Sequence, residues 1–163
     1  MLIRNILEES VRKFDEVKAV KWLKKKEIME RSYGELMENV VSTRKGLLAE
    51  GFEGKHIALI GTSSVEWMES YLGIITGCTT AVPLDAALPC EDLIDLLNRS
   101  DSVALFLSPK LRPYLDAFLE NCPKLQKVWM LQEEVEDAPA KVYGIGELRN
   151  AGKSASADSV CPD

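Results

Sequence analysis

The chain has 163 residues, of which 46% are apolar and 28% are charged, and its formal net charge is −6. This length and composition are typical of one soluble globular domain with a substantial core. The acidic balance argues against a nucleic-acid-binding surface, which needs an excess of Lys and Arg. No apolar run approaches the roughly 20 residues of a membrane-spanning helix, and the charged N-terminus lacks the apolar segment of a signal peptide. We therefore expect a cytoplasmic protein.

The N-terminal segment predicts a helix followed by a short hairpin. Four apolar side chains share one face of the expected helix: Ile3, Leu7, Val11 and Phe14. Two short β-prone stretches, 18–23 and 27–31, then flank the run Lys24-Lys25-Lys26. We interpret this lysine run as a solvated turn rather than a binding patch.

The next segment carries the signals that begin and end a helix. Ser32 and Glu35 have the spacing of a capping box, in which each side chain accepts from the other residue's backbone N–H. Gly51 then ends the helix as a glycine just past the last turn. Four side chains are expected on the buried face of this helix: Leu36, Val40, Thr43 and Leu47.

From His56 onward, apolar strands alternate with helical patterns. Strands are centred near residues 57, 80, 104 and 128, and helices lie between them, including one over 111–119. The strands are continuous apolar runs, which indicates a parallel sheet covered on both faces. The predicted fold class is therefore α/β, a three-layer, mostly parallel sheet with helices on both faces, built from repeated βα units.

The pattern weakens after Leu131. An acidic loop over 132–137 precedes 142–148, which could form a strand edge and one helical turn. The small and polar stretch after Lys153 has too little apolar surface to order itself. The expected organisation is an N-terminal helix and hairpin over 1–31, an α/β subdomain over 32–152 and a flexible linker or tail over 153–163.

The turn Gly61-Thr62-Ser63-Ser64 follows a strand and precedes a helix, as phosphate loops do. A Walker loop needs a second glycine followed by lysine, and a dinucleotide-binding turn needs three glycines. Only Gly61 is present before Gly73. Phosphate binding by this turn alone is therefore not expected.

The same turn partly matches a nucleophile elbow of the GxSxG type. Val65 stands at the last glycine position of that pattern, and the one histidine, His56, lies upstream of Ser63 and Ser64. Ser63 to Glu66 instead has the spacing of a second capping box. A small serine hydrolase that uses Ser63 as its nucleophile is therefore a hypothesis that the sequence supports only weakly.

Other candidate sites are also incomplete. Asp85 and Lys110 each follow a strand, as in a phospho-acceptor module, but acidic residues for Mg²⁺ are missing from the end of the first core strand. Gly144, Gly146 and Arg149 form a glycine pattern that lacks its third glycine. We interpret that segment as a loop.

The cysteines and the histidine do not predict a metal site. None of the four cysteines has CxxC spacing, and the only histidine is His56, whereas zinc needs clustered ligands. Free buried thiols in a reducing compartment are expected. The cysteines are Cys78, Cys90, Cys122 and Cys161.

Four segments of the chain form a series of motifs: Ser32-Tyr33-Gly34-Glu35-Leu36, Ser63-Ser64-Val65-Glu66-Trp67, Tyr71 to Asp85, and Leu88-Pro89 with the helix from Glu91 to Leu97. In their order and spacing over residues 32–107, these motifs resemble those of the AMP-forming acyl-CoA synthetases, the adenylate-forming ligase superfamily. The Val-Pro-Leu-Asp form and the Glu-Trp pair resemble the long-chain fatty acid–CoA ligase branch.

This resemblance implies a fold and a two-step reaction. The fold would be the N-terminal subdomain of the acyl-CoA synthetases. A carboxylate would attack ATP to give an acyl-adenylate and pyrophosphate, and the thiol of coenzyme A would then displace AMP; Mg²⁺ would offset the charge of the triphosphate.

The family's phosphate loop with its lysine, its ribose-binding Asp and its C-terminal lysine have no counterpart here. We therefore assign no catalytic, cofactor-binding or metal-binding residue to this chain, and expect it alone to be inactive and to bind no cofactor.

Three expectations about partners and alternatives follow from the resemblance. The main partner would be the remainder of the parent polypeptide, with a fatty acid, ATP and coenzyme A as that enzyme's substrates. Surfaces that pack on that remainder would be exposed here and could drive self-association. The alternative function is a non-catalytic binding or scaffold module of the same fold.

Overall fold

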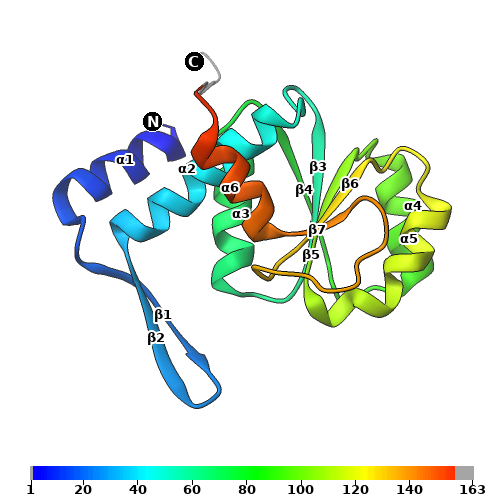
Figure 1. The fold of residues 1–163 in the computed structure, drawn as a ribbon, viewed down its shortest axis with the longest axis horizontal. Helices are drawn as coiled ribbons and strands as arrows, with labels where there is room; N and C mark the ends of the chain where they lie inside the picture. Colours follow the sequence, from blue (N-terminus) through cyan, green and yellow to red (C-terminus); the bar gives the residue numbers. More distant parts are fainter. Residues whose placement is uncertain (1, 157–163) are drawn as a thin grey trace.

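The computed structural model describes residues 2–156. Its helices and strands follow the chain in the order drawn in Figure 1. They are α1 (Ile3–Phe14), β1 (Lys18–Lys24), β2 (Glu27–Ser32), α2 (Tyr33–Ala49), β3 (His56–Ile60), α3 (Val65–Ile75), β4 (Thr80–Leu84), α4 (Cys90–Arg99), β5 (Ala104–Leu107), the 3₁₀-helix η1 (Pro109–Tyr114), α5 (Leu115–Asn121), β6 (Lys127–Met130), β7 (Val142–Gly144) and α6 (Ile145–Ser154).

Five strands form one parallel sheet in the order β4-β3-β5-β6-β7. The first two strands after α2 are neighbours, and the chain then crosses over β3 to place β5 on its other side. This confirms the predicted parallel sheet. It also adds β7, a short edge strand, where the sequence indicated only a possible strand edge.

Helices cover both faces of the sheet, which confirms the three-layer prediction (Figure 1). The helices α2, α3 and α6 lie on one face, where Leu47, Ile74 and Leu148 pack with alternate strand residues. The helices α4 and α5 lie on the other face, where they supply Leu93 and Phe118. Because alternate residues of each central strand face opposite layers, those strands must be apolar throughout.

The edge strand β4 departs from the expectation that every strand is covered on both faces. Thr80 and Pro83 are exposed, and the rest of the strand is only half-buried. Pro83 is tolerated there because an edge strand leaves one side of its backbone without a partner, and proline has no N–H to donate.

The N-terminal helix and hairpin form as predicted, with one correction to the turn. Lys24 belongs to β1, where it pairs with Glu27. The turn itself is the two residues Lys25 and Lys26, whose φ angles are 48° and 70°. Positive φ at both positions is the geometry of a two-residue hairpin turn that matches the strand twist.

The start and end signals of α2 are confirmed. Glu35 N donates to Ser32 Oγ across 3.2 Å, and Ser32 N donates to the Glu35 carboxylate across 2.7 Å. Gly51 follows the helix with φ +80°. The four side chains expected on the inner face of α2 are all buried.

Two helices differ from their predicted form. The helix expected over 111–119 is split, because Pro113 lacks the N–H that an α-helix needs there, and its first part is the 3₁₀-helix η1. The single helical turn expected near Leu148 is a ten-residue helix, α6. Lys153 and Ser154, predicted to begin the tail, are its last residues; residues 157–163 lie outside the described part, and the remaining domain boundaries stay predictions.

Candidate functional site

The carboxyl ends of the parallel strands are where an open α/β sheet binds ligands. Ligands bind most often between two neighbouring strands whose following connections lead toward opposite sides of the sheet. Here that point lies between β3 and β5, since β3 leads to β4 on one side and β5 leads to β6 on the other. Gly61 follows β3 at this edge, and Ser108 follows β5.

Close packing fills this point of the sheet. A Cβ added at Gly61 would lie 2.9 Å from Ser108 Cβ and 3.1 Å from Trp67 Cδ1. Ser108 is itself buried. Gly61 is therefore required by the close approach of side chains from the end of β5 and from α3, and its lack of a side chain does not open a phosphate cradle.

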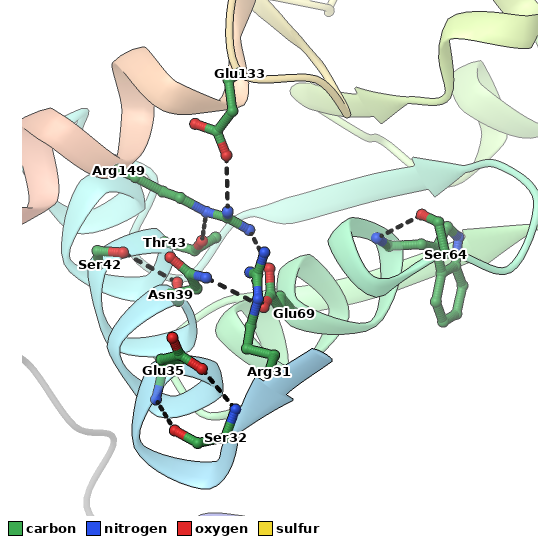
Figure 2. Close-up of polar contacts among 11 residues, drawn as sticks. Arg31, Ser32, Glu35, Asn39, Ser42, Thr43, Ser64, Glu69, Glu133 and Arg149 are labelled. Atoms are coloured by element: carbon green, nitrogen blue, oxygen red, sulfur yellow. Dashed lines mark hydrogen bonds and ion pairs between the residues drawn. The ribbon is translucent and has the colours of Figure 1, made fainter. Parts of the chain in front are cut away.

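The serines of this turn differ in their relation to helix α3. Ser64 is the N-cap, and its Oγ accepts a hydrogen bond from Trp67 N across 3.1 Å (Figure 2). The capping box expected from Ser63 to Glu66 is therefore wrong by one residue. Ser63 is exposed and lies before the cap.

The structure separates the candidate nucleophile from its base. His56 begins β3, whereas Ser63 and Ser64 follow its last residue, so the histidine and the serines lie at opposite ends of that strand. His56 Nδ1 lies 2.7 Å from the carbonyl oxygen of Ser100. A serine hydrolase needs the imidazole within hydrogen-bond reach of the hydroxyl, so this arrangement does not support that hypothesis.

Asp85 and Lys110 have local structural surroundings. The Asp85 carboxylate accepts from Ala87 N across 2.9 Å and so shapes the turn after β4. Lys110 lies in η1 after β5, and β3 stands between these two strands. Within residues 2–156, no group of three or more His, Cys, Asp or Glu side chains could hold a metal ion.

The glycines before and within α6 accommodate the acidic loop. A Cβ added at Gly144 or Gly146 would lie 2.4 or 2.6 Å from the carbonyl oxygen of Glu133. Both positions therefore exclude side chains because the loop after β6 passes directly against them. The glycine pattern therefore needs no phosphate to explain it, and the prediction that this segment is a loop is wrong, because it forms the end of β7 and the start of α6.

The thiols of Cys90 and Cys122 are free. Cys122 is buried, and Cys78 and Cys90 are half-buried; Cys161 lies outside the described residues. Burial raises the pKa of the Cys90 thiol and of the Cys122 thiol, which disfavours the reactive thiolate form. They fit a packing role.

A mostly apolar groove of about 380 Å³ lies where the hairpin meets the start of α3. The hairpin contributes one wall, and the capped end of α3 contributes the other. Trp67 stacks on Tyr71 beside it, with ring centroids 5.4 Å apart. The lining residues are Val20, Lys21, Trp22, Ser63, Ser64, Val65, Trp67 and Met68.

A buried polar cluster joins β2, α2, α3 and α6 (Figure 2). The carboxylate of Glu69, on α3, is fully buried and accepts from Arg31 Nη1, from Asn39 Nδ2 at 3.1 Å and from Arg149 Nη2 at 2.9 Å. The Arg149 guanidinium also donates to Thr43 Oγ1 at 3.3 Å. The carboxylate is thus fully paired, which is the condition for burying a charge.

The sequence patterns do not reveal this cluster. Arg149 stands out in the sequence only as the residue that breaks a glycine pattern, and Glu69 belongs to none of the predicted sites. A carboxylate on the inner face of an otherwise apolar helix is the one signal that could have indicated Glu69. Its partners come from segments up to 80 residues away, so no local spacing reveals them.

Comparison with known proteins identifies the family. The family model described as AMP-binding enzyme matches residues 7–161. This chain belongs to that family. The match covers the whole α/β subdomain expected over 32–152 and confirms the resemblance found in the motifs. Among curated proteins, none matches this chain.

Solved structures share the fold at low sequence identity. The coronafacic acid ligase of Pectobacterium brasiliense superposes with a TM-score of 0.81 and 20% identity over 92% of this chain and 29% of its own. An anthranilate CoA ligase in complex with anthranoyl-AMP gives 0.77 and 15%, over 96% and 28%. A Rhodopseudomonas palustris protein named as a long-chain-fatty-acid CoA ligase gives 0.78 and 13%, over 100% and 38%.

The chain spans roughly a third of the length of these relatives. It is a fragment of the adenylate-forming fold, whose members generally use ATP, Mg²⁺ and coenzyme A. The five-stranded parallel sheet with its flanking helices corresponds to the N-terminal domain of those enzymes. No helix within residues 2–156 is both long and apolar enough to cross a membrane.

Proposed function

We propose that this chain is the N-terminal part of an AMP-forming acyl-CoA synthetase. In the complete enzyme, a carboxylate oxygen attacks the α-phosphorus of ATP and pyrophosphate leaves. The thiol of coenzyme A then attacks the acyl carbonyl and AMP leaves, giving a thioester. The family match over residues 7–161 carries this proposal.

The contribution of this chain to the enzyme is structural support for the reacting groups. Its sequence contains no Ser/Thr/Gly-rich loop with a lysine, and its described residues offer no cluster of ligands for Mg²⁺. We therefore assign no contact with ATP or metal to these residues. The chain alone is therefore not expected to form an acyl-adenylate.

The substrate proposed for the complete enzyme is a long-chain fatty acid. The support is the pair Glu66-Trp67, the segment Val82-Pro83-Leu84-Asp85 and one structural relative with that name. Other relatives are named for anthranilate and coronafacic acid, so aryl and cyclic acids are the competing substrates. A cytoplasmic location is part of the same proposal.

ATP–pyrophosphate exchange tests both parts of the proposal. We expect no exchange above background with the 163-residue chain, and exchange with the longer polypeptide that contains it. With that polypeptide, palmitate should support faster exchange than octanoate, anthranilate or benzoate. Exchange by the chain alone would overturn the assignment of an inactive fragment.

The scaffold-module alternative makes the opposite prediction for the longer polypeptide. A reading frame that ends soon after Asp163, or a longer product without exchange on any acid, would favour the non-catalytic module. Self-association of the chain through exposed apolar surface is a further part of the proposal. Light scattering that shows a strict monomer at high concentration would contradict it.

A further inference from the structure

The hairpin β1–β2 is a basic arm on an acidic protein. Residues 18–32 contain six basic and two acidic side chains, a net charge of +4, whereas the whole chain carries −6. The arm projects away from the sheet and its helices (Figure 1). Such a separation of charge favours an anionic partner at the arm.

The two faces of the hairpin differ in what they contact. Arg31 and Trp22 face the body of the protein, because Arg31 pairs with Glu69 and its guanidinium lies over the Trp22 ring at 5.4 Å. Strand alternation places Leu23 and Ile28 on the opposite face. These two residues are cross-strand partners, and each is 71% exposed.

Three consecutive lysines lie at the tip next to this apolar pair, and the side chain of Lys24 is on the Trp22 face. Lys24 ends β1, and Lys25 with Lys26 forms the turn. Among the described residues, none of these three lysines forms an ion pair with a carboxylate. Lys21, on the same face as Leu23, is neutralised by Glu30 at 2.6 Å. The free positive charge is therefore concentrated at the outer end of the arm.

We propose that the hairpin tip docks on an anionic lipid surface, so that the lysine run is a binding patch and not only the solvated turn that the sequence indicated. Leu23 and Ile28 enter the boundary between headgroups and acyl chains, and the lysines reach the anionic headgroups with their apolar stems lying along the same boundary. The exposed aliphatic pair beside the lysines favours lipid over nucleic acid, whose phosphates need only the charge. This inference rests on the hairpin and is independent of the proposed enzyme activity.

Vesicle co-sedimentation tests the proposal. The 163-residue chain should pellet with vesicles of phosphatidylcholine containing about one-third phosphatidylglycerol, and not with phosphatidylcholine alone. Binding should weaken as salt is raised, because the interaction is partly electrostatic. Equal binding to both kinds of vesicle, or none to either, would overturn the proposal.

Two variants separate charge from apolar insertion. Lys25→Asn/Lys26→Gly removes two charges and suits the left-handed backbone, so the hairpin should fold at least as well. It should weaken binding about 25-fold, since each lysine near an anionic surface contributes roughly a factor of five. Leu23→Thr/Ile28→Thr keeps strand propensity at exposed positions and should weaken binding at least about fivefold.

The matched control is Lys55→Gln/Lys110→Gln, which removes two exposed lysines outside the arm and should bind as the unchanged chain does. An equal loss in this control would overturn the assignment to the hairpin. Binding to duplex DNA that is as tight and as sensitive to the hairpin variants would favour nucleic acid instead. If the longer polypeptide binds no anionic vesicles, the arm is covered by the rest of the enzyme and the proposal is wrong.

Discussion

Arg149 Nη2 lies 2.9 Å from the buried carboxylate of Glu69, although 80 residues separate them in sequence. This contact ties α6 to α3, and the Arg31 contact of the same carboxylate adds the hairpin. Both Glu69 and Arg149 are almost fully buried. The paired charge cluster therefore ties the hairpin to the helices on one face of the sheet.

Removing one partner of this pair should strongly destabilise the fold. Glu69→Gln leaves the buried Arg149 guanidinium without its carboxylate, which costs about 3–5 kcal/mol of unfolding free energy. Arg149→Met should cost less, because Arg31 still pairs with Glu69. The double variant should cost clearly less than the two single losses together. Urea unfolding measures all three.

The control for this pair is Glu133→Gln. Glu133 contacts Arg149 at 3.5 Å but is 67% exposed, so this change should cost less than about 1 kcal/mol. Strict additivity of Glu69→Gln and Arg149→Met would show that the two residues are not coupled.

The cap of α3 predicts different effects for adjacent serines. Ser64→Ala removes the oxygen that accepts from Trp67 N and should lower the unfolding free energy by about 1 kcal/mol. Ser63→Ala should change it by less than about 0.5 kcal/mol, because Ser63 is exposed and lies before the cap. A larger loss of unfolding free energy for Ser63→Ala than for Ser64→Ala would show that Ser63 is the cap of α3.

The capping box of α2 should make stability depend on pH. The hydrogen bond from Ser32 N holds the pKa of the Glu35 carboxyl below its usual value. Its stabilising contribution is therefore complete above the unfolded pKa of about 4.3 and is lost as pH falls through the lower folded pKa. Glu35→Gln should flatten the fall in stability across this acidic range.

Thermal unfolding between neutral pH and about pH 3 measures that dependence. Glu53→Gln, at an exposed position outside the helices and strands, is the control for loss of one carboxylate. If both variants follow the same pH profile, the capping carboxylate does not account for the dependence.

The packing of α6 on α2 should reverse the usual gain in stability when a glycine inside a helix is replaced by alanine. Alanine is better than glycine inside a helix by about 1 kcal/mol. A Cβ at Gly152, however, would lie 1.9 Å from the Ser42 carbonyl oxygen. Gly152→Ala should therefore destabilise the protein by about 1–3 kcal/mol or more, measured by urea unfolding; a rise in stability would contradict the close crossing.

Local sequence patterns determined much of the fold. The capping box of Ser32 and Glu35 spans only three residues, and its hydrogen bonds form whatever lies farther away. The apolar runs such as Ile57 to Ile60 require cover on both faces, and this requirement predicted a parallel sheet with helices on either side. The order and spacing of the motifs likewise indicated the family, because they are properties of the sequence itself.

The tertiary structure alone decided which side chains meet. The sequence favoured Ser63 as the cap because Glu66 follows it by three residues, and only the path of the chain into α3 selects Ser64. Glu69 finds Arg149 because α3 and α6 lie on the same face of the sheet. Such contacts depend on how distant helices cross, and the local pattern of neither segment encodes that geometry.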